Sequence, residues 1–217
     1  FKGVLQIFIS KESFCMKWIE WTQKLQAIAQ NGLTYAKDKF DIERYKQLQD
    51  IISEIIATYT NHDFQEVQNY LTNETGYATP KIDVRGVVFK KDKILMVKDN
   101  ADDRWTLPGG WADILQAPSE NVEREVREES GYKVKATRLL AVYDRSKHKH
   151  STEDPKYVYK MFFLCEIIGG SPRTSIETSA VDFFGLHEIP EISTARITKK
   201  QIKRMYELKE INQTDFD

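Results

Sequence analysis

The stretch that decides the fold runs from Gly109 to Tyr132 and reads GGWADILQAPSENVEREVREESGY. A glycine pair opens it directly after the strand-like segment WTLP, and Gly131 stands near its end. Ser119 is a suitable N-cap, and glycine readily takes the left-handed conformation that often follows a helix. The stretch therefore predicts a loop and then a helix from Ser119 to Ser130.

Three carboxylates share one face of this helix, because Glu125, Glu128 and Glu129 are spaced by three and four residues. Like charges on adjacent turns weaken an isolated helix, whereas a hard cation such as Mg²⁺ would bind them. A solvated acidic face is the alternative interpretation. The glycine pair favours the metal site, because its backbone can approach a ligand closely and its carbonyl oxygens can become ligands.

The spacing of these residues carries a family resemblance. Counted from the second glycine, the chain reads G-x5-Q-x7-R-E-x-x-E-E-x-G-Y. This resembles the box of the Nudix hydrolases, G-x5-E-x7-R-E-U-x-E-E-x-G-U, where U is apolar. The matching positions are Gly110, Arg124, Glu125, Val126, Glu128, Glu129 and Gly131. The resemblance extends over roughly residues 80–210. The preceding segment, with KLQAIAQNGLTY and DIERY, is similar to a Gram-positive bacterial branch of ADP-ribose and CDP-choline pyrophosphatases.

The resemblance implies an α+β Nudix fold, in which α-helices sandwich a mixed β-sheet. It implies Mg²⁺ or Mn²⁺ as cofactor, bound by Glu125, Glu128, Glu129 and the carbonyl of Gly109. Arg124 falls on the arginine that orients the carboxylates of the box. The implied reaction cleaves a nucleoside diphosphate linked to another moiety, with ADP-ribose or CDP-choline favoured, into a nucleoside monophosphate and a phosphorylated product.

Two other functions stay open. One is a housecleaning pyrophosphatase acting on nucleoside or deoxynucleoside triphosphates. The other is a catalytically weak module that binds a nucleotide as a regulatory signal, which the complete carboxylate set disfavours.

The general base is left open by the sequence. In the family it is a glutamate of the box or an acidic residue on a later loop. The later loops offer Glu153 and Asp154 in RSKHKHSTEDPK, and Glu177 before the segment FFGL. Glu177 can equally be a further metal ligand or a surface residue. The catalytic candidates are Arg124, Glu125, Glu128, Glu129, Glu153 and Glu177.

Five residues are candidates for substrate binding: Arg85, Trp105, Trp111, His148 and His150. The tryptophans flank the glycine pair and could stack on a base, although core packing is the commoner role of tryptophan. The histidines could form a transition-metal pair, but solvation or contacts with phosphate and leaving group are favoured over a zinc site.

Gln116 departs from the box, where the family carries a glutamate. The amide keeps a hydrogen-bond acceptor for Arg124 but gives up the charge. This puts in doubt any base or ligand role at position 116 and could lower the affinity for metal. We expect an active enzyme whose water is deprotonated from elsewhere.

The chain divides into four expected segments: a possible upstream extension (1–15), a helical domain (16–75), a linker (76–81) and the Nudix domain (82–217). In the helical domain, one apolar stripe is interrupted at Gly32, and a second helix opens with Asp41 as N-cap. Such short helices bury little area alone, so we expect their apolar faces to meet either the rest of the chain or a second subunit. These faces, and the usual state of the Nudix enzymes that the chain resembles, favour a homodimer. Their mixed charges disfavour a DNA-binding helix-turn-helix.

The composition excludes several classes of protein. The formal net charge of −1 provides no basic field for a nucleic-acid polymer. No apolar run approaches the roughly 20 residues that span a bilayer. The opening FKGVLQIFIS is not read as a signal peptide. The two cysteines, Cys15 and Cys165, suit reduced thiols in the cytoplasm.

Overall fold

The computed structural model describes residues 11–151 and 156–217, with side chains from residue 17 onward. The chain forms two compact units, Phe1–Thr79 and Pro80–Asp217. Within the described residues, every helix is too short or too polar to cross a membrane. Residues 11–15 of the expected upstream extension belong to the first helix, and residues 1–10 lie outside the description.

The first unit consists of three helices, α1 (Lys11–Tyr35), α2 (Lys39–Tyr59) and α3 (Phe64–Thr72). Its core is small, a cluster of the buried apolar residues Ala29, Ile52, Ile56, Val67 and Leu71. The prediction of Asp41 as N-cap of α2 is wrong. The side chain of Asp38 accepts hydrogen bonds from the backbone N–H groups of Phe40 and Asp41, so the helix begins three residues earlier.

Gly32 does not interrupt α1, contrary to the expectation from the apolar stripe. A Cβ atom at this position would lie 2.4 Å from the ring of Tyr45. The glycine therefore lets α1 and α2 approach closely rather than ending the helix. Large apolar side chains nevertheless remain on the surface of α1, where Trp21, Ile28 and Tyr35 are 49%, 54% and 66% exposed.

The second unit is built on a seven-stranded mixed sheet. Its strands are β1 (Lys81–Lys90), β2 (Lys93–Asp99), β3 (Trp105–Thr106), β4 (Tyr132–Asp144), β5 (Val158–Gly170), β6 (Thr178–Phe184) and β7 (Asp215–Phe216). The order is β3-β2-β1-β5-β4-β7, with β6 also paired to β2. The central strands β1 and β5 run parallel, with Asp83 opposite Lys160.

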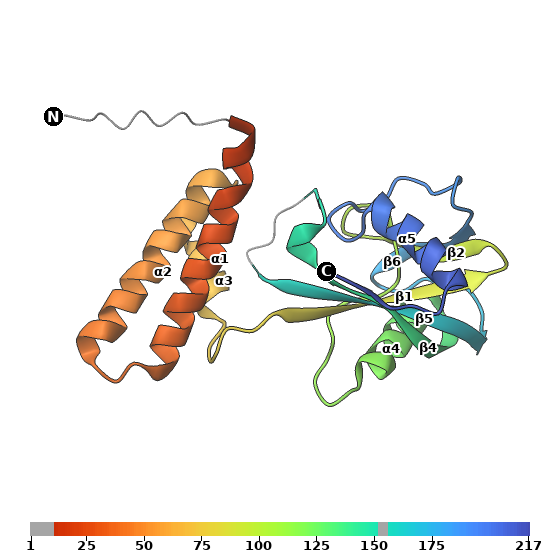
Figure 1. Cartoon of the computed structure of the whole chain (residues 1–217), viewed down its shortest axis with the longest axis horizontal. Helices are drawn as coiled ribbons and strands as arrows, with labels where there is room; N and C mark the ends of the chain where they lie inside the picture. The colour runs from red at the N-terminus through yellow and green to blue at the C-terminus, as the bar shows by residue number, and fades with distance from the viewer. Residues whose placement is uncertain (1–10, 152–155) are drawn as a thin grey trace. The chain divides into compact units, whose positions relative to one another are not determined.

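Two helices cover the opposite faces of this sheet, α4 (Pro118–Ser130) on one and α5 (Lys199–Glu210) on the other (Figure 1). On the α4 face, Val122 and Val126 pack against Val84 and Val88 of β1. On the α5 face, Met205 belongs to a core cluster with Val87 of β1, Met96 of β2, Leu140 of β4 and Phe162 of β5. The predicted fold, a mixed sheet between α-helices, is confirmed.

The start of α4 differs from the prediction by two residues. Ala117, not Ser119, is the N-cap, and Pro118 occupies the first helical position, where a missing N–H is tolerated. The side chain of Glu120 accepts a hydrogen bond from the backbone N–H of Ala117 at 2.7 Å. The helix ends at Gly131, whose φ of 79° confirms the expected left-handed cap.

Candidate active site

The glycine pair is fixed against β1. The carbonyls of Pro108 and Gly110 accept hydrogen bonds from the backbone N–H groups of Gly86 and Val84, both at 2.8 Å. Gly109 has a φ of 140°, and a Cβ atom there would lie 2.0 Å from the Val84 carbonyl oxygen, so the position requires glycine. In the described part of the chain, no hydrogen bond reaches the Gly109 carbonyl. This oxygen keeps both lone pairs for another partner.

Glu129 projects from the last turn of α4 onto this loop. Its side chain is buried, and Oε2 accepts a hydrogen bond from the Gly109 N–H at 2.9 Å. Burial raises the pKa of Glu129 to about 7, with Glu125 and Glu177 adding to the rise. The charge of Arg85 and the Gly109 N–H oppose that rise. The carboxylate is thus held among other acids in a poorly hydrated place.

Glu125 and Glu128 are both held by Arg124. Its Nη2 lies 2.9 Å from Glu125 Oε1, and its Nη1 lies 2.9 Å from Glu128 Oε2. Burial raises the pKa of Glu125, and the Arg124 charge partly offsets this. A Cβ atom on Gly110 would lie 3.2 Å from Glu125 Oε2, so the second glycine leaves room for this carboxylate. Arg124 thus contacts two of the three glutamates on this face of α4.

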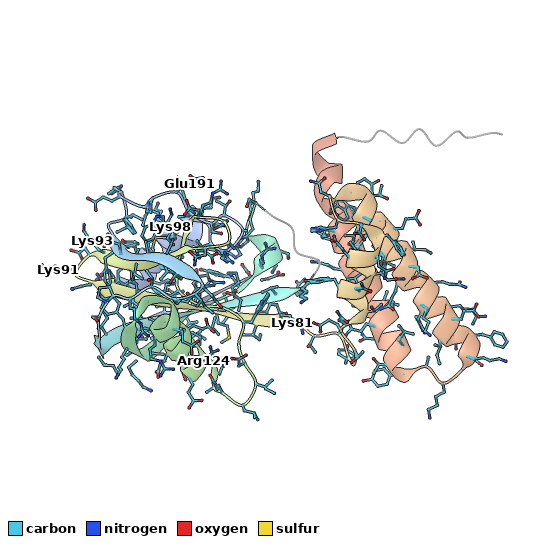
Figure 2. All side chains as sticks on the ribbon, turned by 180° about the vertical axis from the view of Figure 1, so that it is seen from behind. Lys81, Lys91, Lys93, Lys98, Arg124 and Glu191 are labelled. Carbon is cyan, nitrogen blue, oxygen red and sulfur yellow. The ribbon has the colours of Figure 1, made fainter. Side chains whose placement is uncertain are left out.

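Arg124, labelled at α4 in Figure 2, also ties the preceding loop to this helix. Its Nη2 donates to Asp113 Oδ2 at 2.7 Å, and its Nε donates to Gln116 Oε1 at 3.3 Å. Gln116 therefore supplies the acceptor that its amide was expected to keep. Asp113 was missed by sequence reasoning, because eleven residues separate it from Arg124 and no local pattern pairs the two.

Asn121 of α4 holds the loop before this helix through hydrogen bonds of its side chain. Its side chain is buried; Oδ1 accepts from the Asp113 N–H at 2.8 Å, and Nδ2 donates to the carbonyls of Asp113 and Gln116. The loop tip leaves Ile114 and Leu115 almost fully exposed. The sequence signal for Asn121 was weak, since asparagine in a first helical turn is commonly a surface residue.

Glu177 is brought to the end of α4 by the loop before β6. The Thr178 hydroxyl donates to the Glu129 carbonyl at 2.8 Å, and the Arg173 N–H donates to the Ser130 carbonyl at 2.9 Å. Glu177 is exposed, yet its charge contributes to the raised pKa of Glu129. Of the later acidic candidates, Glu177 therefore lies near the carboxylate cluster. Glu153 and Asp154 fall outside the described residues.

Arg85 lies on β1 in a buried cluster of charges. It makes a bidentate contact with Asp83, through Nε to Oδ1 at 2.8 Å and Nη2 to Oδ2 at 2.7 Å. Lys160 Nζ donates to the same Asp83 Oδ1 at 2.8 Å. The positive charge of Arg85 also opposes the rise in the pKa of both Glu125 and Glu129.

The two tryptophans occupy different environments. Trp105 is partly buried and packs edge-to-face on Phe184, with 4.7 Å between ring centroids, which is a core contact. Trp111 is 49% exposed and forms an isolated bridge with Asp83 of β1. Trp111 is thus the one of this pair with an accessible ring beside the glycine pair.

Among the described residues, the rings of the two histidines contact different partners. His148 Nε2 lies 3.2 Å from Asp217 Oδ1, and its ring packs against Tyr143. His150 Nδ1 lies 3.2 Å from the Thr194 carbonyl. Burial, with the charges of Arg145 and Lys160, lowers the pKa of His150 to about 4. The expectation of solvated rings therefore does not describe His150, whose ring nitrogens are enclosed.

The donor chemistry of the cluster fits a hard divalent cation. Three glutamates of one helix and the unbonded Gly109 carbonyl are oxygen ligands of the kind Mg²⁺ and Mn²⁺ prefer. Among the described residues, no group of three acidic, histidine or cysteine side chains converges as a preformed metal site. Arg124 holds Glu125 and Glu128, while Gly109 holds Glu129. Metal binding would require rotation of these side chains.

Comparison with known proteins matches this architecture to a family. Residues 79–206 match the model of the NUDIX domain, and residues 16–71 match a model described as the UDP-X-like, N-terminal oligomerisation domain. The chain belongs to the Nudix hydrolases, enzymes that generally need divalent metal ions. The helices α1, α2 and α3 correspond to the region that matches the N-terminal oligomerisation domain model.

Individual relatives cover most of the chain. The protein "Putative ADP-ribose pyrophosphatase YjhB" of Bacillus subtilis (strain 168) is 41% identical over 88% of this chain and 91% of its own length. An ADP-ribose pyrophosphatase of Methanocaldococcus jannaschii is 30% identical over 54% of this chain and 69% of its own. A solved UDP-X diphosphatase aligns with a TM-score of 0.61 and 33% identity, covering 94% of this chain and 99% of that one. A solved ADP-ribose pyrophosphatase of Streptococcus suis 89-1591 aligns with a TM-score of 0.58 and 39% identity, over 64% of this chain and all of that one.

Proposed function

We propose that this protein is a Mg²⁺- or Mn²⁺-dependent pyrophosphohydrolase that cleaves a nucleoside diphosphate linked to another moiety. Its products would be a nucleoside monophosphate and a phosphorylated second product. The observation that carries the proposal is the set Glu125, Glu128 and Glu129 on one face of α4, beside the unbonded Gly109 carbonyl. The names of the relatives favour ADP-ribose and UDP-linked substrates, and CDP-choline remains a candidate from the sequence resemblance.

The roles proposed for the side chains follow from their positions. Glu125, Glu128, Glu129 and the Gly109 carbonyl would hold the metal ions, which neutralise phosphoryl oxygens and acidify a bound water. Arg124 positions Glu125 and Glu128, as its two contacts at 2.9 Å allow. Arg85 offers a positive charge to the phosphoryl groups, and the exposed ring of Trp111 offers a stacking surface. Trp105, His148 and His150 contact other residues of the protein and are therefore weaker candidates for substrate binding.

Glu177 is the later-loop acid that we propose as general base or further ligand. Its loop is fastened to the end of α4 through Thr178, so a water between the two loops could be within its reach. Replacement by glutamine separates the two roles. If Glu177 is the general base, Glu177→Gln should abolish the increase of kcat with pH. If Glu177 is a metal ligand, the variant should instead need a higher metal concentration for half-maximal rate.

A substrate panel tests the function. ADP-ribose, UDP-linked sugars, CDP-choline, NADH, diadenosine polyphosphates and deoxynucleoside triphosphates are offered with Mg²⁺ or Mn²⁺, and phosphate is measured after phosphatase treatment. We expect cleavage of a nucleoside diphosphate derivative at least tenfold faster than of any triphosphate. Preference for a triphosphate would favour the housecleaning alternative. A substrate that raises the melting temperature without being cleaved would favour the regulatory module.

We also propose a homodimer in the cytoplasm. The oligomerisation-domain match and the exposed apolar side chains of α1 support self-association through the first unit. The buried, unpaired Cys165 suits a reducing compartment. A small nucleotide derivative remains the proposed partner, with no nucleic-acid polymer and no membrane.

A further inference from the structure

The buried charges around Arg85 form a connected unit. Asp83 and Arg85 stand two residues apart on β1 and thus on the same face of the sheet, while Lys160 lies directly opposite Asp83 on β5. The side chains of Arg85, Asp83 and Lys160 are only 5%, 8% and 3% exposed. Three charges so far from water need mutual contacts, because an unpaired one would be strongly destabilising.

Asp83 is held rigidly at the centre of this unit. Its Oδ1 accepts from both Arg85 Nε and Lys160 Nζ at 2.8 Å, and its Oδ2 accepts from Arg85 Nη2 at 2.7 Å. Three charged donors on two oxygens leave the carboxylate no freedom to turn. The bidentate contact in turn fixes the plane of the guanidinium group.

Arg85 is not fully used by these contacts. A guanidinium group carries five N–H donors. Two of them bind Asp83, and a third, on Nη1, donates to the Leu107 carbonyl at 3.1 Å. Among the described residues, the other two N–H groups, one on each Nη, have no hydrogen-bond partner. A buried cation with spare donors, beside Glu125 and Glu129, is suited to an anion that enters the same site.

We propose that Asp83 and Lys160 are positioning residues, which hold the guanidinium of Arg85 with its two spare donors toward a phosphoryl oxygen of the substrate. Lys160 fixes Asp83, Asp83 fixes Arg85, and Arg85 binds the diphosphate beside the carboxylate cluster. The identity of the diphosphate rests on the proposed function. The ordering of Arg85 rests on the hydrogen bonds described above.

The competing role for the three residues is structural, a buried ion cluster that stabilises the sheet. A double-mutant cycle separates the two roles. We expect Arg85→Met to lower kcat/KM by about a hundredfold and Asp83→Asn by about tenfold. In the double variant, Asp83→Asn should have no further effect, since there is no guanidinium left to position. An equal loss of kcat/KM from Asp83→Asn in both backgrounds would overturn the proposal.

Lys160→Met covers the case in which Asp83→Asn does not fold. This variant leaves the neutral Asp83–Arg85 pair in place, so it is the least disruptive single change in this unit. We expect kcat/KM to fall by about threefold when Arg85 is present and to stay unchanged in the Arg85→Met background. Unchanged kcat/KM in both backgrounds contradicts the proposal. Arg204→Met is the matched control. It removes an arginine of α5 that also donates to a carboxylate, Asp215, at 2.8 Å, and it should leave kcat/KM unaltered.

Calorimetry with Mg²⁺ and pyrophosphate gives a readout independent of turnover. We expect the Kd of the intact protein to rise about tenfold in Arg85→Met and Asp83→Asn. If no substrate of the panel is cleaved but this pattern of Kd holds, the proposed function fails and the positioning role stands. If a substrate is cleaved but the effects of Arg85→Met and Asp83→Asn on kcat/KM are additive, the positioning role alone is overturned. Absence of both pyrophosphate binding and cleavage overturns both.

Discussion

Glu129 shows at a single side chain how chemistry and stability conflict. Its burial raises the pKa to about 7, so an ionised carboxylate at this position is unfavourable for the folded protein itself. Such a group is retained where its charge serves a ligand. The Gly109 N–H and the Arg85 charge reduce the penalty without removing it.

Replacing Glu129 by glutamine should therefore separate activity from stability. We expect turnover to fall by about a hundredfold or more, because a metal ligand is lost at nearly unchanged volume. The melting temperature in EDTA should not fall, since a buried amide is less costly than a buried carboxylate. Glu166→Gln, on an exposed position of β5, is the control that keeps both properties. Turnover near the original rate under saturating Mg²⁺ would refute the metal-site assignment.

Gln116 competes with three acids for Arg124. A glutamate there would bind the guanidinium more strongly than the amide does at 3.3 Å, and would draw it away from Glu125 and Glu128. We expect Gln116→Glu to lower the Mg²⁺ concentration for half-maximal rate by a factor of about two to five. Gln116→Ala serves as control and should not lower it. A higher Mg²⁺ requirement in Gln116→Glu would contradict this account of the departure from the box.

His150 gives a test by pH. Its folded pKa of about 4 lies below the ordinary value of 6.5, so the unfolded state binds more protons between these two values. Its contribution to stability is complete above pH 6.5 and is lost as the pH falls toward 4. We expect His150→Gln to make the melting temperature depend less on pH between about 4 and 6.5. The exposed His187→Gln should leave the profile as it was, and a profile equally steep in His150→Gln would contradict the enclosed, neutral ring.

At the level of elements, the site depends on how two segments are fastened to α4. The loop before the helix is organised by Asn121, and the loop before β6 is joined to the helix end by Thr178. Each contact joins a residue of α4 to a loop outside the helix, so the geometry of the carboxylates depends on partners that α4 itself does not contain.

Thr178→Val tests the second fastening. The change keeps the volume but removes the hydroxyl that donates to the Glu129 carbonyl at 2.8 Å. We expect kcat to fall by about three- to tenfold and the free energy of unfolding to drop by about 1–3 kcal/mol, because the carbonyl is left unpaired in a buried place. Ser179→Ala, one residue further and exposed, should change neither quantity. An unchanged kcat in Thr178→Val would show that the loop needs no such anchor.

These same elements show what a sequence can predict. The helix α4 and its glycine cap follow from local periodicity and end signals, and both were confirmed apart from the N-cap. The N-cap at Ala117 was missed because the Glu120 side chain caps from within the helix. Asp113 and Thr178 could not be identified, because their partners are set by loop folding. The Asp83–Lys160 contact depends on the register between β1 and β5, which no local pattern encodes.

At the scale of the whole molecule, the first unit leaves several of its large apolar side chains exposed. Its fully buried apolar core is small, while Trp21, Ile28 and Tyr35 recur every seventh residue along α1 and remain about half exposed or more. A recurrence of seven residues places them on one line of the helix. Such a line is typical of a face that packs against another helix.

Ile28→Lys tests whether this line is the dimer interface. We expect light scattering at micromolar concentration to give about twice the chain mass of 25.3 kDa for the original protein and the chain mass for the variant. Ile176→Lys, at a 94% exposed position of the second unit, should leave the assembly unchanged. A dimer that survives Ile28→Lys would place the interface elsewhere.

The buried charges of Asp83, Arg85 and Lys160 also constrain how this protein can evolve. A single substitution at Asp83 leaves two like charges facing each other without water, and one at Arg85 or Lys160 strips the acid of a partner. Each isolated step is therefore disfavoured, whereas a paired change that keeps the charges matched is tolerated more readily. Among homologues, we expect these three positions on two different strands to be inherited and exchanged together.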